Sequence, residues 1–184
     1  MNKFVSRAGE KLQFALESFK FKVKDLMVAD FGSSTGGFVD CLLQNGASKI
    51  YSIDTSYGEL AWTLRNNLKV VVMERVNAMH VKLPEKVDLI TIDTAWTKQI
   101  LTIPNALINL KNDGQIISLI KPHYEAPKEY LKKGRLQDEY VEEVLNKTKN
   151  DIFAAGGKVT DIVESPIVGE KGKNREFLAL IRKN

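Results

Sequence analysis

The chain has 184 residues, 43% of them hydrophobic and 27% charged, which predicts one globular domain over residues 1–184 and argues against a disordered or fibrous protein. A single cysteine, Cys41, excludes an internal disulfide framework, and no apolar run is long enough for a signal peptide or a membrane span, so we expect a cytoplasmic protein with no membrane partner. The net charge of +4 is compatible with a polyanionic partner but does not establish one.

The predicted elements alternate between strand and helix along most of the chain. Residues 1–24 carry apolar side chains at helical spacing, which predicts an N-terminal amphipathic helix. Short apolar runs predict strands at residues 27–31, 49–53, 70–74, 87–92, 115–120, 158–163 and 176–181. Amphipathic patterns between them predict helices at about residues 37–44, 59–66, 98–110 and 139–155.

This alternation predicts a Rossmann-like α/β fold. Several strands are continuous apolar runs, such as VVVM and IISLI, as expected for parallel strands that are covered on both faces. The last two strands are separated by a loop with no helical pattern, so they are expected to pair antiparallel. We therefore expect a mostly parallel seven-stranded sheet with an antiparallel last strand.

A glycine-containing loop, VADFGSSTGGF at residues 28–38, joins the first strand to the first helix. It matches neither the dinucleotide pattern G-x-G-x-x-G nor the Walker pattern, because its glycines are spaced differently and no lysine follows. The acid Asp30 suits a cofactor that carries a cationic sulfonium and an ammonium but no phosphate. The loop therefore predicts S-adenosylmethionine, bound by Asp30, Gly32, Ser33, Gly36, Gly37 and Phe38.

Three further polar residues follow the next three predicted strands. Asp54 lies 24 residues after Asp30, where an acid can accept hydrogen bonds from both ribose hydroxyls. Asn77 is expected at the adenine rim, and Asp93 at the ligand-binding edge of the sheet. Each alone could be a helix cap or a turn residue. Four such residues after four successive strands favour the cofactor interpretation, and hence an S-adenosylmethionine-dependent methyltransferase.

Several motifs occur in order along the chain: FVSRAGEKL (4–12), DFGSSTGGFVDCLL (30–43), YGELAW (57–62), ERVNA (74–78), DLITID (88–93), IKPHYE (120–125), SPIVG (165–169) and NREFL (174–178). Together they resemble the haemolysin A (TlyA) branch of the FtsJ-type RNA 2′-O-methyltransferases. The resemblance implies methyl transfer from S-adenosylmethionine to a ribose 2′-hydroxyl of RNA, with ribosomal RNA as partner. Two features depart from the family: its usual N-terminal S4-type RNA-binding domain is not in this sequence, and TAWTKQ at residues 94–99 replaces the family's usual VSFISL.

The resemblance also implies a catalytic tetrad of Lys11, Asp93, Lys121 and Glu176. A ribose hydroxyl must lose a proton, and a second ammonium would lower the pKa of a lysine toward neutrality. On this hypothesis Lys121 deprotonates the hydroxyl, Lys11 holds the hydroxyl or a flanking phosphate, and the two acids orient the lysines. The alternatives are a solvated lysine on an amphipathic helix for Lys11 and an edge-strand charge for Glu176.

Basic residues around the cleft predict phosphate-backbone binding, although they could equally be scattered surface charges. They are Arg7, Lys11, Lys20, Lys22 and Lys24 near the N-terminus, Lys128, Lys132, Lys133 and Arg135 after the fifth strand, and Lys171, Lys173 and Arg175 before the last strand.

Other side chains have predicted roles as well. Trp96 and Tyr124 are candidates for stacking on a base, whereas Trp62 and Cys41 are expected to pack in the core. His80 and His123 are too isolated in the sequence for a metal site, so no metal is expected. Two rival functions remain open: a methyltransferase of the same fold acting on a small molecule or protein, and a catalytically idle RNA-binding or haemolysin-like protein.

Overall fold

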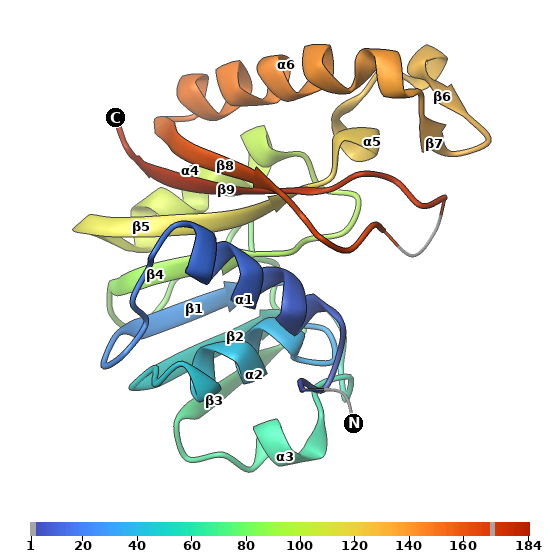
Figure 1. The fold of residues 1–184 in the computed structure, drawn as a ribbon. Helices are drawn as coiled ribbons and strands as arrows, with labels where there is room; N and C mark the ends of the chain where they lie inside the picture. Colours follow the sequence, from blue (N-terminus) through green and yellow to red (C-terminus); the bar gives the residue numbers. More distant parts are fainter. Residues whose placement is uncertain (1–2, 170–171) are drawn as a thin grey trace.

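The computed structural model describes residues 3–169 and 172–184, and its centre is a twisted seven-stranded sheet (Figure 1). The strand order across the sheet is β3-β2-β1-β4-β5-β9-β8. The strands are β1 (Met27–Phe31), β2 (Lys49–Asp54), β3 (Val70–Glu74), β4 (Val87–Ile92), β5 (Leu110–Ile120), β8 (Gly157–Glu164) and β9 (Phe177–Lys183).

The sheet is parallel except at β9, which pairs antiparallel with both β5 and β8. The predicted fold class is therefore confirmed, including the antiparallel pair formed by the last two strands. β1 lies between β2 and β4, so the order of connections reverses there. In open α/β sheets ligands bind beyond the carboxyl ends of the strands at such a point.

Helices cover both faces of the sheet, which explains why its strands are apolar throughout (Figure 1). Side chains of α1 (Ala8–Ser18) and α2 (Gly37–Gln44) share one buried cluster with the sheet, and α3 (Trp62–Arg65) adds Leu64 to it. Side chains of α4 (Gln99–Asn109) and α6 (Val141–Ala154) belong to the cluster on the other face. A single turn, α5 (Pro122–Glu125), follows β5.

Two sequence predictions about the segment after β2 are wrong. The helix predicted at residues 59–66 forms only at Trp62–Arg65. The residue before it, Ala61, is held by the glycine-containing loop at residues 28–38, which we call the cofactor loop, because the Ala61 N–H donates a hydrogen bond to the Thr35 carbonyl at 3.1 Å. Trp62 was expected to pack in the core, yet its side chain is 76% exposed. Cys41 is buried as predicted.

The segment between α5 and α6 contains a hairpin that the sequence did not predict. It comprises β6 (Leu131–Lys132) and β7 (Arg135–Leu136), flanked by the 3-10 turns η1 (Lys128–Tyr130) and η2 (Asp138–Tyr140). Strands of two residues are too short to display an alternating pattern, which is why sequence periodicity could not reveal them.

Candidate active site

Two adjoining cavities lie at the carboxyl ends of the parallel strands, with volumes of about 630 Å³ and 380 Å³. They share a boundary formed by Gly32, Ser34, Asp93, Ala95 and Trp96. The larger cavity extends toward α1 and β9, and the smaller one toward the ends of β2 and β3. Together they form one cleft with two compartments.

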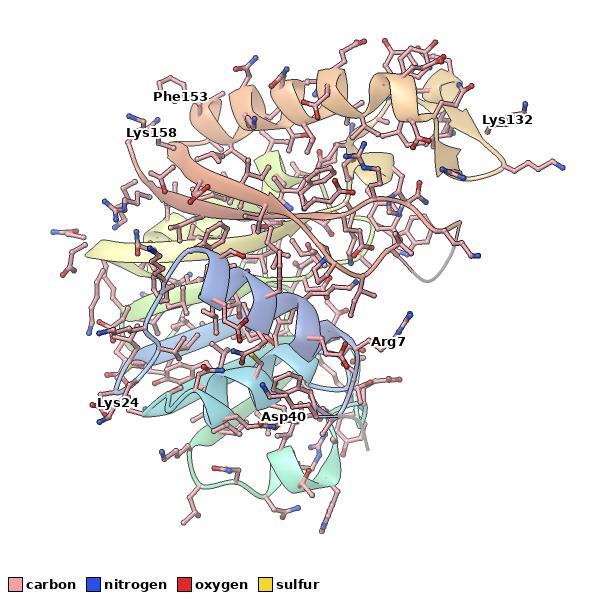
Figure 2. All side chains as sticks on the ribbon, in the orientation of Figure 1. Arg7, Lys24, Asp40, Lys132, Phe153 and Lys158 are labelled. Atoms are coloured by element: carbon pink, nitrogen blue, oxygen red, sulfur yellow. The ribbon has the colours of Figure 1, made fainter. Side chains whose placement is uncertain are left out.

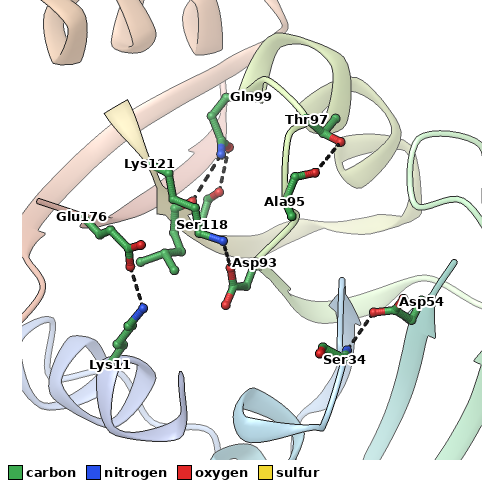
Figure 3. Close-up of polar contacts among 11 residues, drawn as sticks. Lys11, Ser34, Asp54, Asp93, Ala95, Thr97, Gln99, Ser118, Lys121 and Glu176 are labelled. Atoms are coloured by element: carbon green, nitrogen blue, oxygen red, sulfur yellow. Dashed lines mark hydrogen bonds and ion pairs between the residues drawn. The ribbon is translucent and has the colours of Figure 1, made fainter. Parts of the chain in front are cut away.

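The smaller compartment is lined by two of the predicted cofactor residues, Asp54 and Asn77. Asp54 Oδ2 accepts a hydrogen bond from the Ser34 N–H at 2.7 Å (Figure 3), and its Oδ1 accepts from both the N–H and the hydroxyl of Ser56 at 2.8 Å. Each carboxylate oxygen has two lone pairs, so Oδ2 retains capacity for a ribose hydroxyl. The acid at this strand end and the amide beside it fit an adenosine group.

The glycine loop lies directly against the end of β4. Gly32 has φ +88°, and a Cβ built on it would lie 2.6 Å from the Asp93 carbonyl oxygen. A side chain at this position would therefore push the loop away from Asp93. By contrast, Gly36 lines neither cavity, because its Cα faces Leu60 and Leu64. Gly36 thus packs the loop against α3 and does not reach the cleft.

Asp30 also lies behind the loop and lines neither compartment. The side chain is fully buried, its Oδ1 accepts from the Thr91 hydroxyl at 2.6 Å, and its Oδ2 has no hydrogen-bond partner among the described residues. Burial raises the pKa of Asp30 to about 7, with further increases from the charges of Asp93 and Asp54. The acid is therefore placed under the cofactor loop and holds a proton up to neutral pH.

Replacing Asp30 by asparagine should stabilise the protein at alkaline pH. Because the pKa is about 7 in the folded state and near 4 when unfolded, the folded state binds more protons between these values, and stability falls as pH rises through that window. Asparagine does not titrate, so the variant should gain about 2–4 kcal/mol over wild type at pH 8 and little at pH 4. Urea unfolding at both pH values measures this. Asp113→Asn is the control, because Asp113 is exposed. An equal gain in the free energy of unfolding for Asp113→Asn, or no gain for Asp30→Asn, would contradict the argument from burial.

The larger compartment contains all four predicted tetrad residues (Figure 3). They form two ion pairs: Lys121 Nζ lies 2.5 Å from Asp93 Oδ1, and Lys11 Nζ lies 2.6 Å from Glu176 Oε2. Asp93 and Lys121 directly follow β4 and β5, and Glu176 directly precedes antiparallel β9, so the topology brings all three to one edge. The alternative of a solvated Lys11 or an edge-strand Glu176 is wrong, because Glu176 is only 4% exposed and its partner is Lys11.

The predicted direction of the Lys121 pKa shift is wrong. Burial lowers the pKa of Lys121, but the charge of Asp93 and its hydrogen bond to the ammonium outweigh burial and raise the pKa above its usual value. The second ammonium, on Lys11, is paired with Glu176 and does not reverse this. Lys121 is therefore protonated at neutral pH.

Lys11 reaches the cleft because α1 and α2 cross at very short range. A Cβ on Gly37 would lie 2.2 Å from Ser6 Oγ and 2.9 Å from the Gly9 N–H nitrogen. A Cβ on Gly9 would in turn lie 2.8 Å from the Gly37 carbonyl oxygen. This contact brings the first turn of α1, with Lys11, over the start of α2 and the cofactor loop.

Aromatic residues line the same compartment beside Lys121. The rings of Trp96 and Tyr124 lie 4.8 Å apart between centroids, and those of His123 and Tyr124 lie 4.1 Å apart. Burial and the charge of Lys121 lower the pKa of His123 to about 4, so its imidazole is neutral. The sequence analysis proposed Trp96 and Tyr124 for stacking and did not propose His123 for this compartment. The signal that could have indicated it is the position of His123, two residues after Lys121.

A buried polar network that the sequence also missed supports the residues around Lys121. Glu125 Oε1 accepts from the Gln99 backbone N–H at 2.9 Å, which satisfies the first turn of α4. The Ser118 hydroxyl donates to Gln99 Oε1 at 2.7 Å (Figure 3). The network joins the start of α4 to the segments on either side of Lys121 and so fixes the backbone around it.

The predicted basic rim is only partly supported. Lys132, Lys133 and Lys173 are exposed, whereas Arg175 is held by Glu164 through contacts of 2.7 Å and 2.6 Å. Lys24 lies far from Arg7, at the opposite end of the α1 region (Figure 2), so the proposal that this end of the N-terminal segment adds to the rim is wrong. Lys171 lies outside the described residues.

The described part of the chain shows neither a metal centre nor a membrane-spanning helix. Over residues 3–169 and 172–184, no group of three or more His, Cys, Asp and Glu side chains could hold a metal ion. In the same part of the chain, none of the helices combines the length and the apolar character that crossing a bilayer requires.

Comparison with known proteins places these features in a family. The FtsJ-like methyltransferase family matches residues 4–182. YqxC of Bacillus subtilis, named as a candidate rRNA methyltransferase, is 40% identical over 185 residues, which cover 96% of this chain and 64% of the relative. TlyA of Mycobacterium tuberculosis, named as a 16S/23S rRNA (cytidine-2′-O)-methyltransferase, is 34% identical, with 96% of this chain and 68% of the relative covered.

Solved structures agree with this comparison. A candidate hemolysin from Streptococcus thermophilus has a TM-score of 0.95 at 34% identity, with 100% of this chain and 68% of that chain covered. An S-adenosylmethionine dependent methyltransferase from Mesorhizobium loti has a TM-score of 0.67 at 16% identity, covering 92% of this chain and 96% of that one, which shows a shared fold alone. The chain thus spans 64% to 68% of the length of the three more similar proteins.

Proposed function

Because the chain belongs to the FtsJ-like methyltransferase family, we propose that it transfers a methyl group from S-adenosylmethionine to a ribose 2′-hydroxyl of RNA, with ribosomal RNA as the substrate. The observation that carries this proposal is the placement of two lysine–carboxylate pairs in a cleft that adjoins the glycine loop. Such a site would act where ribosomes are, and we therefore propose a cytoplasmic location.

The smaller compartment supports a role in holding the cofactor. Asp54 Oδ2 would accept a hydrogen bond from one ribose hydroxyl, Asn77 would contact the adenine rim, and Gly32 would let the loop backbone approach the ligand. When bound, the cofactor supplies an electrophilic methyl group and a positive charge. Asp93 lines both compartments, so the reacting methyl group would face the boundary between them.

The larger compartment supports a role in activating the hydroxyl. The ribose oxygen must align with the methyl group and the sulfur, form the new O–C bond as the S–C bond breaks, and give up one proton. A positive charge held beside Lys121 would lower the pKa of the lysine against the effect of Asp93, so that Lys121 could release its proton to solvent before transfer. Neutral Lys121 would then accept the hydroxyl proton, while Lys11, held by Glu176, orients the hydroxyl or a flanking phosphate.

Labelled-methyl transfer tests the proposal. The full chain is incubated with labelled S-adenosylmethionine and either deproteinised ribosomal RNA or intact subunits, and the modified nucleotide is then mapped. Incorporation at a ribose 2′-oxygen is the expected result. Label in a small molecule or protein but in no RNA would support the same-fold rival, and cofactor binding without transfer to any acceptor would support an idle RNA-binding protein.

Trp96 should contribute more to RNA binding than to cofactor binding. Its side chain is 78% exposed beside Tyr124, where a nucleobase could stack on it, although it also lies on the boundary between the two compartments. Trp96→Ala should raise the KM for RNA about tenfold and raise the Kd for S-adenosylmethionine by a smaller factor. Trp62→Ala is the matched control, since Trp62 is 76% exposed but lies on α3 and lines neither compartment. Equal effects of the two substitutions would argue against stacking at Trp96.

A further inference from the structure

The hairpin β6–β7 extends from the same edge of the molecule as the cleft, beyond α5 (Figure 1). Lys132, Lys133 and Arg135 in this hairpin are exposed, while its two leucines turn inward, Leu136 being buried and Leu131 half-buried. Figure 2 shows Lys132 projecting away from the body of the protein. The outer surface of the hairpin therefore presents three cationic side chains.

The turn of the hairpin has a lysine where folding would favour another residue. Lys133 and Gly134 are its two central residues, with φ +51° and +78°. Two left-handed central residues define a type I′ turn, in which asparagine or glycine is strongly preferred at the first position. A lysine is disfavoured there, so the conformation of the turn does not itself require a lysine at this position.

The hairpin is fixed relative to the catalytic groups by Asn174, which is 3% exposed. The Asn174 side chain accepts from the Leu136 N–H at 2.9 Å and donates to the Gly134 carbonyl at 3.1 Å. Asn174 lies two residues before Glu176 in the segment that leads into β9. A ligand held by the hairpin would thus be held at a set distance from the Lys11–Glu176 pair.

We propose that this hairpin is an RNA-binding arm that contacts phosphates of the substrate outside the cleft. This inference rests on the proposed function and adds a second point of contact to it. Lys132 and Lys133 carry the interaction, because Arg135 is partly neutralised by Asp138 at 3.2 Å. Two exposed ammonium groups on a projecting hairpin are complementary in charge to a phosphate backbone.

Lys133→Asn removes the charge and gives the turn a residue that it prefers, so the fold should be retained. The affinity for a ribosomal RNA fragment should fall about 3- to 10-fold, and the slope of log Kd against log salt should decrease by about 0.7–0.9. Lys132→Gln should act in the same way, and the double variant should lose both contacts. The Kd for S-adenosylmethionine should not change.

Lys158→Gln is the matched control, because Lys158 lies on the far side of the molecule from Lys132 (Figure 2). It should leave both the affinity and the salt slope unchanged. If wild type binds and methylates RNA but Lys133→Asn binds as wild type does, the arm is refuted while the proposed function stands. If Lys133→Asn binds intact subunits more weakly than wild type but binds naked RNA equally well, the RNA-binding arm is also refuted, in favour of a contact with a ribosomal protein. If wild type binds no RNA, the proposed function itself fails.

Discussion

Replacing Lys121 by methionine is expected to reduce methyl transfer by about 10²- to 10⁴-fold, the range that a positioned acid or base contributes. Methionine retains an unbranched apolar side chain but removes the ammonium group and therefore the ion pair with Asp93. Lys121 does not line the smaller compartment, so the Kd for S-adenosylmethionine should change only a few-fold. The loss should therefore be one of kcat and not of cofactor affinity.

The test compares single-turnover methyl transfer with calorimetric binding of the cofactor. Lys111→Met is the matched control, because Lys111 forms a similar pair with Asp88 at 2.6 Å outside the cleft. The control should transfer methyl groups at the wild-type rate. Near-normal turnover of Lys121→Met would remove Lys121 from the catalytic assignment, and a parallel loss in both variants would point to a general effect of breaking an ion pair.

Replacing Gly32 by alanine is expected to weaken cofactor binding by about 10²-fold, which corresponds to roughly 3 kcal/mol. The new Cβ would lie 2.6 Å from the Asp93 carbonyl oxygen, so the loop and the end of β4 must separate. This movement would change the boundary that the two compartments share. Alanine at φ +88° is also strained, which should cost about 1–3 kcal/mol of stability.

Gly58→Ala separates the steric effect from the conformational strain. Gly58 has φ +79°, but a Cβ there would meet nothing within 4 Å. Both variants should lose some thermal stability, and only Gly32→Ala should lose affinity for S-adenosylmethionine in isothermal titration. Equal affinities of Gly32→Ala and Gly58→Ala for S-adenosylmethionine would show that the close approach of Gly32 to Asp93 is not needed for binding.

The sequence alone predicted the order of elements and the class of fold, because hydrophobic periodicity and strand-end acids are local signals. The loop at residues 28–38, Asp54 and Asp93 were recognisable because parallel strands end at one edge whatever their exact lengths. Helices whose buried face repeats regularly, such as α2 and α4, were predicted to within a residue. The short α3 was not, because a contact with the distant cofactor loop determines where it begins.

Only the tertiary structure decided how the polar residues act. Lys11 pairs with Glu176 across 165 positions of sequence. Lys121 pairs with Asp93, which raises the pKa of Lys121 against the effect of burial. In the same way, burial beneath the loop gives Asp30 a pKa of about 7, and the neighbours of Trp62 leave it exposed. Electrostatic free energies depend on distance and on solvent access, which are set by packing between segments far apart in the chain. Residue identity and spacing therefore located the site, and the packing of α1 against α2 and of β9 against β5 determined which charged groups meet in it.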